Sequence, residues 1–268
     1  MAAREGWERT LYEGSAPYYA QGRLPYPPAM AVVLRDELGL DGTGRLLDVG
    51  CGPGSVTLLL APLFEEVVGV DPDPGMIAEA ASQAALRGVG NARWEMLPAE
   101  ELPADLGIFR AATFAQSFHW MDRPRVAGAV RSMLEPDGSW VHVGATTHEG
   151  VDDARDLPFP SPPRAEIAEL VRQYLGPTRR PGVSGEDDVL VAAGFSRPRR
   201  VIVPGHVHER SEDDVVASVF SLSWAAPYLF GDRRAAFETD LREVLRRTSP
   251  DGRCAEHARE VELVIWAR

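Results

Sequence analysis

The chain has 268 residues, which suits one large α/β domain or one domain with a sizeable insertion. Its 40 acidic residues outnumber its 28 basic ones, and the net charge of −12 argues against a nucleic acid or an anionic membrane as partner. The two cysteines are too few for a disulfide framework or a structural zinc site, and without an apolar leader or an apolar run of membrane-spanning length we expect a cytoplasmic protein.

The N-terminal part of the chain is predicted to be helical. Residues 12–27 are rich in Tyr, Gly and Pro, which indicates a short helix followed by an irregular segment. Pro28 favours the first turn of a second helix, and Gly39 is a suitable residue to end it.

Strands and helices alternate through residues 41–150. The predicted strands are 45–50, 66–71, 92–97, 108–116 and 139–146. Apolar residues at helical spacing follow the first strand, Asp73-Pro74 and Asp122 begin two further helices, and the turn at 135–138 ends the last of them. This alternation predicts a parallel sheet with helices on both faces.

Residues 151–268 depart from this alternation. A proline-rich loop is predicted at 151–164, helices at 165–175 and 186–193, a sixth strand at 200–207, two helices within 212–247 and a seventh strand at 260–266. The predicted fold is therefore a Rossmann-like, seven-stranded, mostly parallel sheet, in which residues 151–268 supply the remaining strands and helical insertions, part of which forms a lid.

A glycine-rich turn follows the first strand in the string Leu46–Gly54. Gly50, Gly52 and Gly54 allow the backbone to approach a ligand closely, and the helix that follows offers free N–H groups. Asp48, two residues before the first glycine, would be a poor neighbour for a pyrophosphate. It suits a cationic ligand instead, either by holding the loop or by acting through water on an ammonium group.

Asp71 ends the second strand, 17 residues after Gly54. A carboxylate at this place can accept two hydrogen bonds from the hydroxyls of a ribose, and Met76 can cover one face of an adenine. A glycine triplet alone often marks only a tight turn. The order of strand, triplet, helix, strand and acid makes a nucleoside site the better interpretation.

These residues resemble the class I S-adenosylmethionine-dependent methyltransferases over most of the chain. Leu46–Gly54 is similar to the family's first motif and 67–71 to its second, while 98–103 (PAEELP) is similar to the A-E-x-L-P segment after the third strand. Residues 117–122 (SFHWMD) and 19–27 (YAQGRLPYP) resemble segments of one subgroup, which acts mostly on small molecules, natural products included.

The resemblance implies an antiparallel last strand, S-adenosylmethionine as cofactor and a small organic acceptor, such as a natural-product intermediate. It divides the chain into an N-terminal helical segment (1–40) that closes over the cofactor, a cofactor-binding core (41–150) and the remaining strands with the lid (151–268). The implied cofactor-binding residues are Tyr19, Arg23, Asp48, Gly50, Cys51, Gly52, Gly54, Asp71, Pro72, Met76, Ala99, Glu100 and Gln116.

His119 is the candidate catalytic residue. It follows the fourth strand, where ligands bind in open α/β sheets, and a histidine there can accept a proton from the acceptor. No lysine in the chain competes as a base. The alternative is a structural histidine that holds a loop. Trp120, Trp224 and Tyr228 are the candidate substrate-binding residues, although the aromatic stretch 220–230 is equally consistent with ordinary helix packing.

Other readings are weaker. A methyltransferase fold can bind the cofactor and catalyse a different reaction, such as a cyclisation, whereas a nicotinamide-dependent oxidoreductase is disfavoured by Asp48 and by the G-x-G-x-G spacing. His206 and His208 share one strand face without an evident third ligand, and Asp152-Asp153 suits a loop, so no metal site is predicted.

Overall fold

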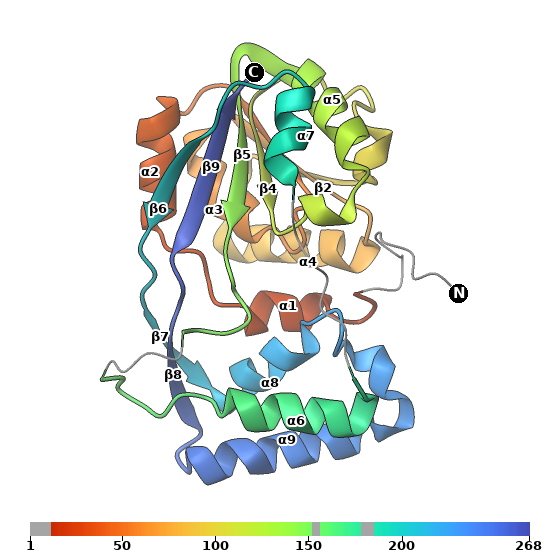
Figure 1. Cartoon of the computed structure of the whole chain (residues 1–268), viewed down its shortest axis with the longest axis vertical. Coiled ribbons are helices and arrows are strands. Elements are labelled where there is room, and N and C mark those ends of the chain that lie inside the picture. Colours follow the sequence, from red (N-terminus) through yellow and green to blue (C-terminus); the bar gives the residue numbers. More distant parts are fainter. Residues whose placement is uncertain (1–11, 152–155, 178–184) are drawn as a thin grey trace.

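The computed structural model describes residues 12–151, 156–177 and 185–268, and its centre is a seven-stranded sheet (Figure 1). The strand order is β3-β2-β1-β4-β5-β9-β6. The strands are β1 (Arg45–Val49), β2 (Glu66–Asp71), β3 (Ala92–Met96), β4 (Phe109–Ala115), β5 (Leu134–Gly144), β6 (Arg199–Val203) and β9 (Val261–Ala267). Only β9 runs antiparallel to its neighbours, β5 and β6, so the predicted mostly parallel sheet is confirmed.

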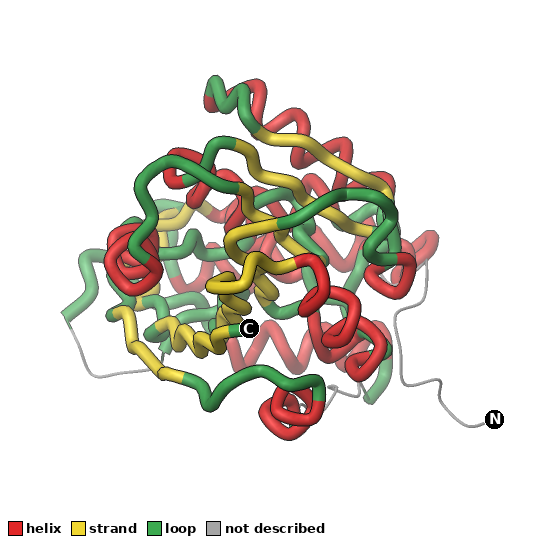
Figure 2. The backbone as a smooth tube through the Cα atoms, turned by 90° about the horizontal axis from the view of Figure 1, so that it is seen from above, coloured by secondary structure: helices red, strands yellow, loops and turns green. Residues whose placement is uncertain are grey.

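Helices cover both faces of this sheet (Figure 2). Those that pack on it are α2 (Ala29–Leu38), α3 (Ser55–Leu60), α4 (Pro74–Arg87), α5 (Arg123–Met133) and α7 (Glu186–Ala192). Three short helical turns lie in the connections between strands and helices: η1 (Ala61–Leu63), η2 (Ala99–Glu101) and η3 (Phe118–Trp120). One face buries Met30 and Leu60 with β1 and β5, and the other stacks Phe114 on Trp140 with ring centroids 3.7 Å apart. The sheet therefore lies between two apolar layers.

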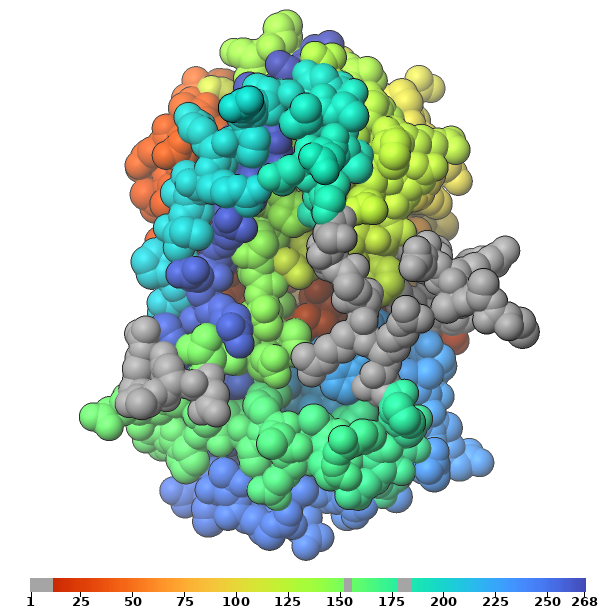
Figure 3. Space-filling view, viewed as in Figure 1, coloured from red at the N-terminus to blue at the C-terminus, as the bar shows by residue number. Residues whose placement is uncertain are grey.

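A second body, the helical lobe, has its own apolar core. It consists of α6 (Arg164–Leu175), α8 (Glu212–Phe220), η4 (Pro227–Arg233), α9 (Arg234–Thr248) and the two-stranded sheet of β7 (Val207–Ser211) and β8 (Arg253–His257). Glu256 on β8 accepts hydrogen bonds from Arg164 at 2.6 Å and from Arg210 at 2.9 Å, which joins α6, β7 and β8. Figure 3 shows this lobe below the sheet, with a hollow between them.

The two-stranded sheet corrects the prediction of one strand at 200–207. The chain leaves β6 at Val203, because Pro204 has no N–H to donate to a ladder, and Gly205 then crosses in contact with the backbone of Ala258. The predicted turn at 135–138 lies within β5, whose register against β4 shifts between Phe109 and Ala111, so the turn forms a bulge in the strand.

The predicted N-terminal segment divides between the two bodies. Helix α2 packs on the sheet, whereas α1 (Ala16–Gly22) packs along α8. Gly22 touches the backbone of Ala217, and Ser15 Oγ donates to the carbonyl of Phe220 at 3.0 Å. Residues 1–11 of that segment lie outside the described residues. Nowhere in the described chain is there a helix with the length and apolar character needed to cross a bilayer.

Candidate cofactor site

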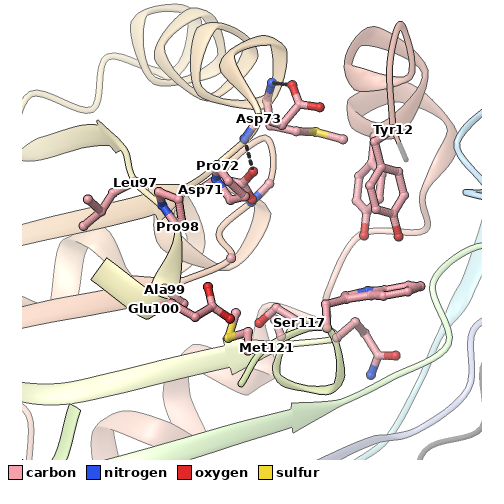
Figure 4. Close-up of a pocket in the computed structure, with 17 residues that line it drawn as sticks. Tyr12, Asp71, Pro72, Asp73, Leu97, Pro98, Ala99, Glu100, Ser117 and Met121 are labelled. Atoms are coloured by element: carbon pink, nitrogen blue, oxygen red, sulfur yellow. Dashed lines mark hydrogen bonds between the residues drawn. The ribbon is translucent and has the colours of Figure 1, made fainter. Parts of the chain in front are cut away.

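Two joined cavities lie at the C-terminal ends of β1, β2 and β4. The first encloses about 730 Å³ and the second about 1050 Å³, each including space open to solvent. Tyr19, Gly50, Gly52 and Ala115 line both, so the two cavities adjoin each other at these residues. In Figure 4, Tyr12 faces the first cavity from one side, Asp71 and Pro72 lie at the strand end, and Ser117 and Met121 lie opposite.

The three glycines of the loop have different surroundings. Gly50 has a φ of +67°, and a Cβ there would lie 2.5 Å from Ser117 Cβ, so it is needed for packing as well as for its conformation. Gly52 has a φ of +54° and no atom within 4 Å of a Cβ position, so its space belongs to the cavities. Gly54, for which a ligand contact was predicted, faces the ring of Trp94 and lines neither cavity.

Asp71 connects the glycine loop to the turn before α4. One carboxylate oxygen accepts from the N–H of Gly52 and the other from the N–H of Asp73, both at 2.9 Å. Burial raises the pKa of Asp71 to about 6, partly opposed by these two hydrogen bonds. Asp73 in turn caps α4 by accepting from Gly75 and Met76, which places Met76 against the cavity.

Asp48 holds the loop from beneath and lines neither cavity. Its side chain is 1% exposed and accepts hydrogen bonds from Thr57 Oγ1 on α3 at 2.5 Å and from Thr113 Oγ1 on β4 at 2.7 Å. Burial raises its pKa. Of its two predicted roles, the described contacts are those of a residue that fixes the loop.

The far end of the first cavity is formed by the turn after β3. Pro72, Met76, Leu97, Pro98, Ala99 and Glu100 line it. Glu100 Oε1 accepts from the N–H of Asp122 at 2.8 Å, which ties this turn to the start of α5. Cys51 lines the second cavity, and burial raises the pKa of its thiol well above its usual value, so it is a packed residue of the loop.

Tyrosines from α1 and the turn before it cover the site. Tyr19 and Tyr12 meet edge to face with centroids 6.2 Å apart, and burial raises the pKa of Tyr12 to about 12. Arg23 lies 4.3 Å over the Tyr19 ring, and its guanidinium donates to Ser221 Oγ and to the Ser221 carbonyl, each at 2.8 Å. Tyr12 was not among the predicted site residues, since it precedes the segment 19–27 that resembles a family motif.

The charges that line the two cavities are of opposite sign. Asp71, Asp73 and Glu100 are the charged residues along the first cavity, and all are acidic. Arg23 and Arg87 are those along the second, and both are basic. Arg87, in the last turn of α4, was also missed. A ligand that extends through both cavities is therefore best matched when one part is cationic and the other anionic.

His119 lies beside the site, and its ring is not part of the cavity lining, although Ser117, Trp120 and Met121 are. Burial lowers the pKa of His119 to about 4, with further lowering from His142 and Arg123. Its ring packs against Trp120 with centroids 4.8 Å apart.

Gln116, Trp224 and Tyr228 are the remaining predicted site residues. Gln116 has a φ of +57° at the end of β4 and lines the first cavity. Trp224 packs against the core of the helical lobe, Tyr228 is 42% exposed, and neither lines the first cavity, which Trp120 does line. The His206 and His208 rings are 3.9 Å apart, no group of three metal-ligating side chains occurs among the described residues, and Asp152 and Asp153 lie outside them.

Comparisons with known proteins agree with this architecture. Residues 46–138 match the family model of a methyltransferase domain. The uncharacterized methyltransferase Rv3342 of Mycobacterium tuberculosis is 34% identical over 143 residues, which cover 52% of this chain and 54% of that protein. The ubiquinone/menaquinone biosynthesis C-methyltransferase UbiE of Citrifermentans bemidjiense is 34% identical over 110 residues, which cover 39% and 47%. The chain thus spans about half the length of the curated relatives it matches.

Two solved structures share the fold. The YcgJ protein of Bacillus subtilis superposes with a TM-score of 0.51 at 19% identity, covering 90% of this chain and 98% of that one. The [4+2]-cyclase SpnF superposes with a TM-score of 0.51 at 18% identity, covering 97% and 91%. The chain shares the Rossmann-like fold of these two structures, and its segment 46–138 carries the similarity to the methyltransferase domain.

Proposed function

We propose that this protein is a methyltransferase that transfers a methyl group from S-adenosylmethionine to a small organic acceptor. The observation that carries the proposal is the opposite charge of the two joined cavities. S-adenosylmethionine has a nucleoside and a sulfonium at one part and a carboxylate at the other. A dinucleotide is a poorer match, because the loop has the spacing G-x-G-x-G and not the G-x-G-x-x-G that is usual around a pyrophosphate.

The residues present fit this cofactor. Asp71 uses one lone pair of each carboxylate oxygen for the backbone, so each oxygen can still accept from a ribose hydroxyl. Met76, Ala99 and Glu100 line the first cavity and would surround the adenine, and Gly52 leaves room for the methionine part. Arg23 or Arg87 would attract the carboxylate.

When bound, the cofactor supplies an activated methyl group on a positively charged sulfur. The chain then has to align the acceptor and exclude water. Tyr12, Tyr19 and Trp120 are the apolar surfaces suited to exclude water at this position, since all three line the first cavity. His119 remains our proposal for the group that accepts the acceptor's proton where one has to be removed.

The matched relatives support methyl transfer, because both are named methyltransferases and UbiE is named a C-methyltransferase. The SpnF neighbour is a cyclase, and it shares only the fold with this chain. A turnover experiment separates the two activities, because only methyl transfer consumes S-adenosylmethionine.

The test has two stages. We expect S-adenosylmethionine and S-adenosylhomocysteine to raise the melting temperature of the purified chain, with no rise from NAD, since a ligand of the native state stabilises it by mass action. Mass spectrometry of a metabolite extract incubated with the protein and S-adenosylmethionine should then show an acceptor heavier by one methyl group. A response to NAD alone would overturn the cofactor assignment, and cofactor binding without consumption would favour non-methylating chemistry.

A further inference from the structure

A third cavity lies where the seven-stranded sheet meets the two-stranded sheet. The ends of β4 and β5, the β6–β7 connection and the β8–β9 connection enclose about 1430 Å³, including space open to solvent. Since β6 continues into β7 and β8 into β9, two connections cross here side by side. None of the resemblances or motifs assigns this space a role.

Backbone contacts fix the walls of this cavity. The N–H of Val151 donates to the carbonyl of His257 at 2.8 Å, and the N–H of Ala258 donates to the carbonyl of His206 at 2.9 Å. Gly205 lies so close to Ala258 that a Cβ would collide with its carbonyl. The cavity is therefore part of the folded framework, as small-molecule sites usually are.

Gln116 separates this cavity from the cofactor site, because it lines both the third cavity and the first. Its left-handed backbone turns the side chain toward β5, where Nε2 donates to the carbonyl of Val143 at 3.3 Å. A molecule in the third cavity thus lies one residue away from the first.

The titratable residues of the third cavity are His257, Arg259 and Glu260. Arg259 is exposed, and within the parts of the chain that the structure describes it has neither an ion pair nor a hydrogen bond through its side chain. In a chain with a net charge of −12, an acid without a partner is expected, whereas a cation without one at a cavity is informative. A guanidinium binds a carboxylate through two parallel hydrogen bonds.

We propose that the third cavity is the acceptor site and that it takes a small molecule with a carboxylate group, which Arg259 binds while the rest of the molecule reaches Gln116. The proposal rests on the proposed function and adds to it the location and chemical class of the acceptor. It differs from the sequence-based prediction, which placed the acceptor near Trp120, Trp224 and Tyr228.

The test uses the full chain saturated with S-adenosylhomocysteine and three probes of one shape, observed by ¹⁹F NMR. The probes are 4-fluorobenzoate, 4-fluorobenzyl alcohol and 4-fluorobenzylamine, which are anionic, neutral and cationic. We expect the benzoate to bind at least tenfold more tightly than the alcohol, against the overall negative charge of the protein. Arg259→Gln should remove this preference, and Arg259→Lys should keep most of it.

Arg197→Gln is the matched control. Arg197 is also exposed and without an ion pair among the described residues, but it lies just before β6, at the end of that strand away from the third cavity. It should leave all three affinities unchanged. Equal binding of the benzoate and the alcohol, tighter binding of the amine, or an unaltered preference in Arg259→Gln would each overturn the proposal. S-adenosylhomocysteine binding is measured in every variant, because its loss in the parent chain would instead contradict the proposed function.

Discussion

The carboxylate of Asp71 accepts a hydrogen bond from the N–H of Gly52 at 2.9 Å, although the two residues lie 19 positions apart. This bond joins the end of β2 to the loop after β1, so the acid that is proposed to bind the ribose also fixes the backbone that faces the methionine part. Its charge therefore matters to both halves of the proposed site.

Cofactor binding should weaken at acidic pH because of Asp71. Its pKa of about 6 in the folded protein lies above the ordinary 3.8, so lowering the pH through 6 protonates the carboxylate and removes an acceptor for the ribose. Protonation at the same time favours the folded state of the free protein, since the raised pKa reflects an unfavourable buried charge.

We expect the Kd of S-adenosylhomocysteine to rise about tenfold between pH 7.5 and pH 5. Calorimetry measures this change, and Asp71→Asn should flatten the profile. Asp71→Ala should lose about 1.5–3 kcal/mol of binding free energy at pH 7.5. Unchanged binding in Asp71→Ala would exclude the ribose role.

Gly50→Ala and Gly52→Ala should fail in different ways. Both positions have positive φ, which costs an alanine about 1–2 kcal/mol. Gly50→Ala adds a collision with Ser117 and should lower the melting temperature strongly, whereas Gly52→Ala meets no atom and should fold but lose cofactor affinity. Thermal unfolding and calorimetry on both variants check this, and equal melting temperatures would contradict it.

Asp48→Ala should destabilise the protein even without ligand. It leaves the buried hydroxyls of Thr57 and Thr113 without their acceptor, at about 1–3 kcal/mol each. Asp48→Asn keeps an acceptor oxygen and should lose less. Urea denaturation of the free protein measures both; a stable Asp48→Ala that had lost only cofactor affinity would point to direct ligand contact instead.

Glu256→Gln should be costly because the carboxylate lies between two arginines. Burial alone would raise the pKa of Glu256, but Arg164 and Arg210 outweigh it and lower the pKa. The lowered pKa means that this stabilisation is complete above the ordinary value of 4.5 and is lost as the pH falls further. We expect a loss of about 3–5 kcal/mol at neutral pH.

Glu209→Gln is the control for Glu256, since Glu209 pairs with Arg253 on the same two-stranded sheet but both side chains are more than half exposed. It should change the free energy of unfolding by less than about 1 kcal/mol. Similar losses of unfolding free energy in both variants would show that burial of the Glu256 ion pairs does not increase their contribution to stability.

The proposed role of His119 predicts a specific pH dependence. If it accepts the proton, His119→Ala should lower kcat by roughly 10²–10⁴ and leave cofactor affinity within about twofold. The pH–rate profile of the parent should then have a limb near pH 4, following the lowered pKa. His119→Asn keeps orientation without proton acceptance. Parent-like turnover in both variants would assign His119 a structural role.

Local chemistry accounts for what could be predicted from the sequence. The glycines at 50 and 52 are needed for their backbone conformations, and Asp73 caps a helix two residues after a strand, so neighbouring residues define these features. The direction of side chains after β4 is different. The short turn at 118–120 directs Trp120 to the cavity and leaves His119 outside the lining, and this depends on packing against distant elements.

The parts that could not be predicted depend on pairing between distant segments. Strand β8 (Arg253–His257) has mixed polar residues, and it is a strand only because β7 pairs with it across residues 212–252. Tyr12 and Arg87 line the cavities from elements that no motif covers. Contacts between distant segments produce no local sequence pattern from which these features could be predicted.

The attachment of α1 to α8 determines how small a working fragment of this protein can be. A truncated chain that keeps only residues 41–150 would retain the glycine loop, Asp48 and Asp71, and thus every strand end of the cofactor site. It would lack Tyr19 and Arg23, and adding the N-terminal helix back would not restore them in place, since α1 is held by Phe220 and Ser221. The smallest unit that keeps the proposed cofactor site covered therefore includes the helical lobe.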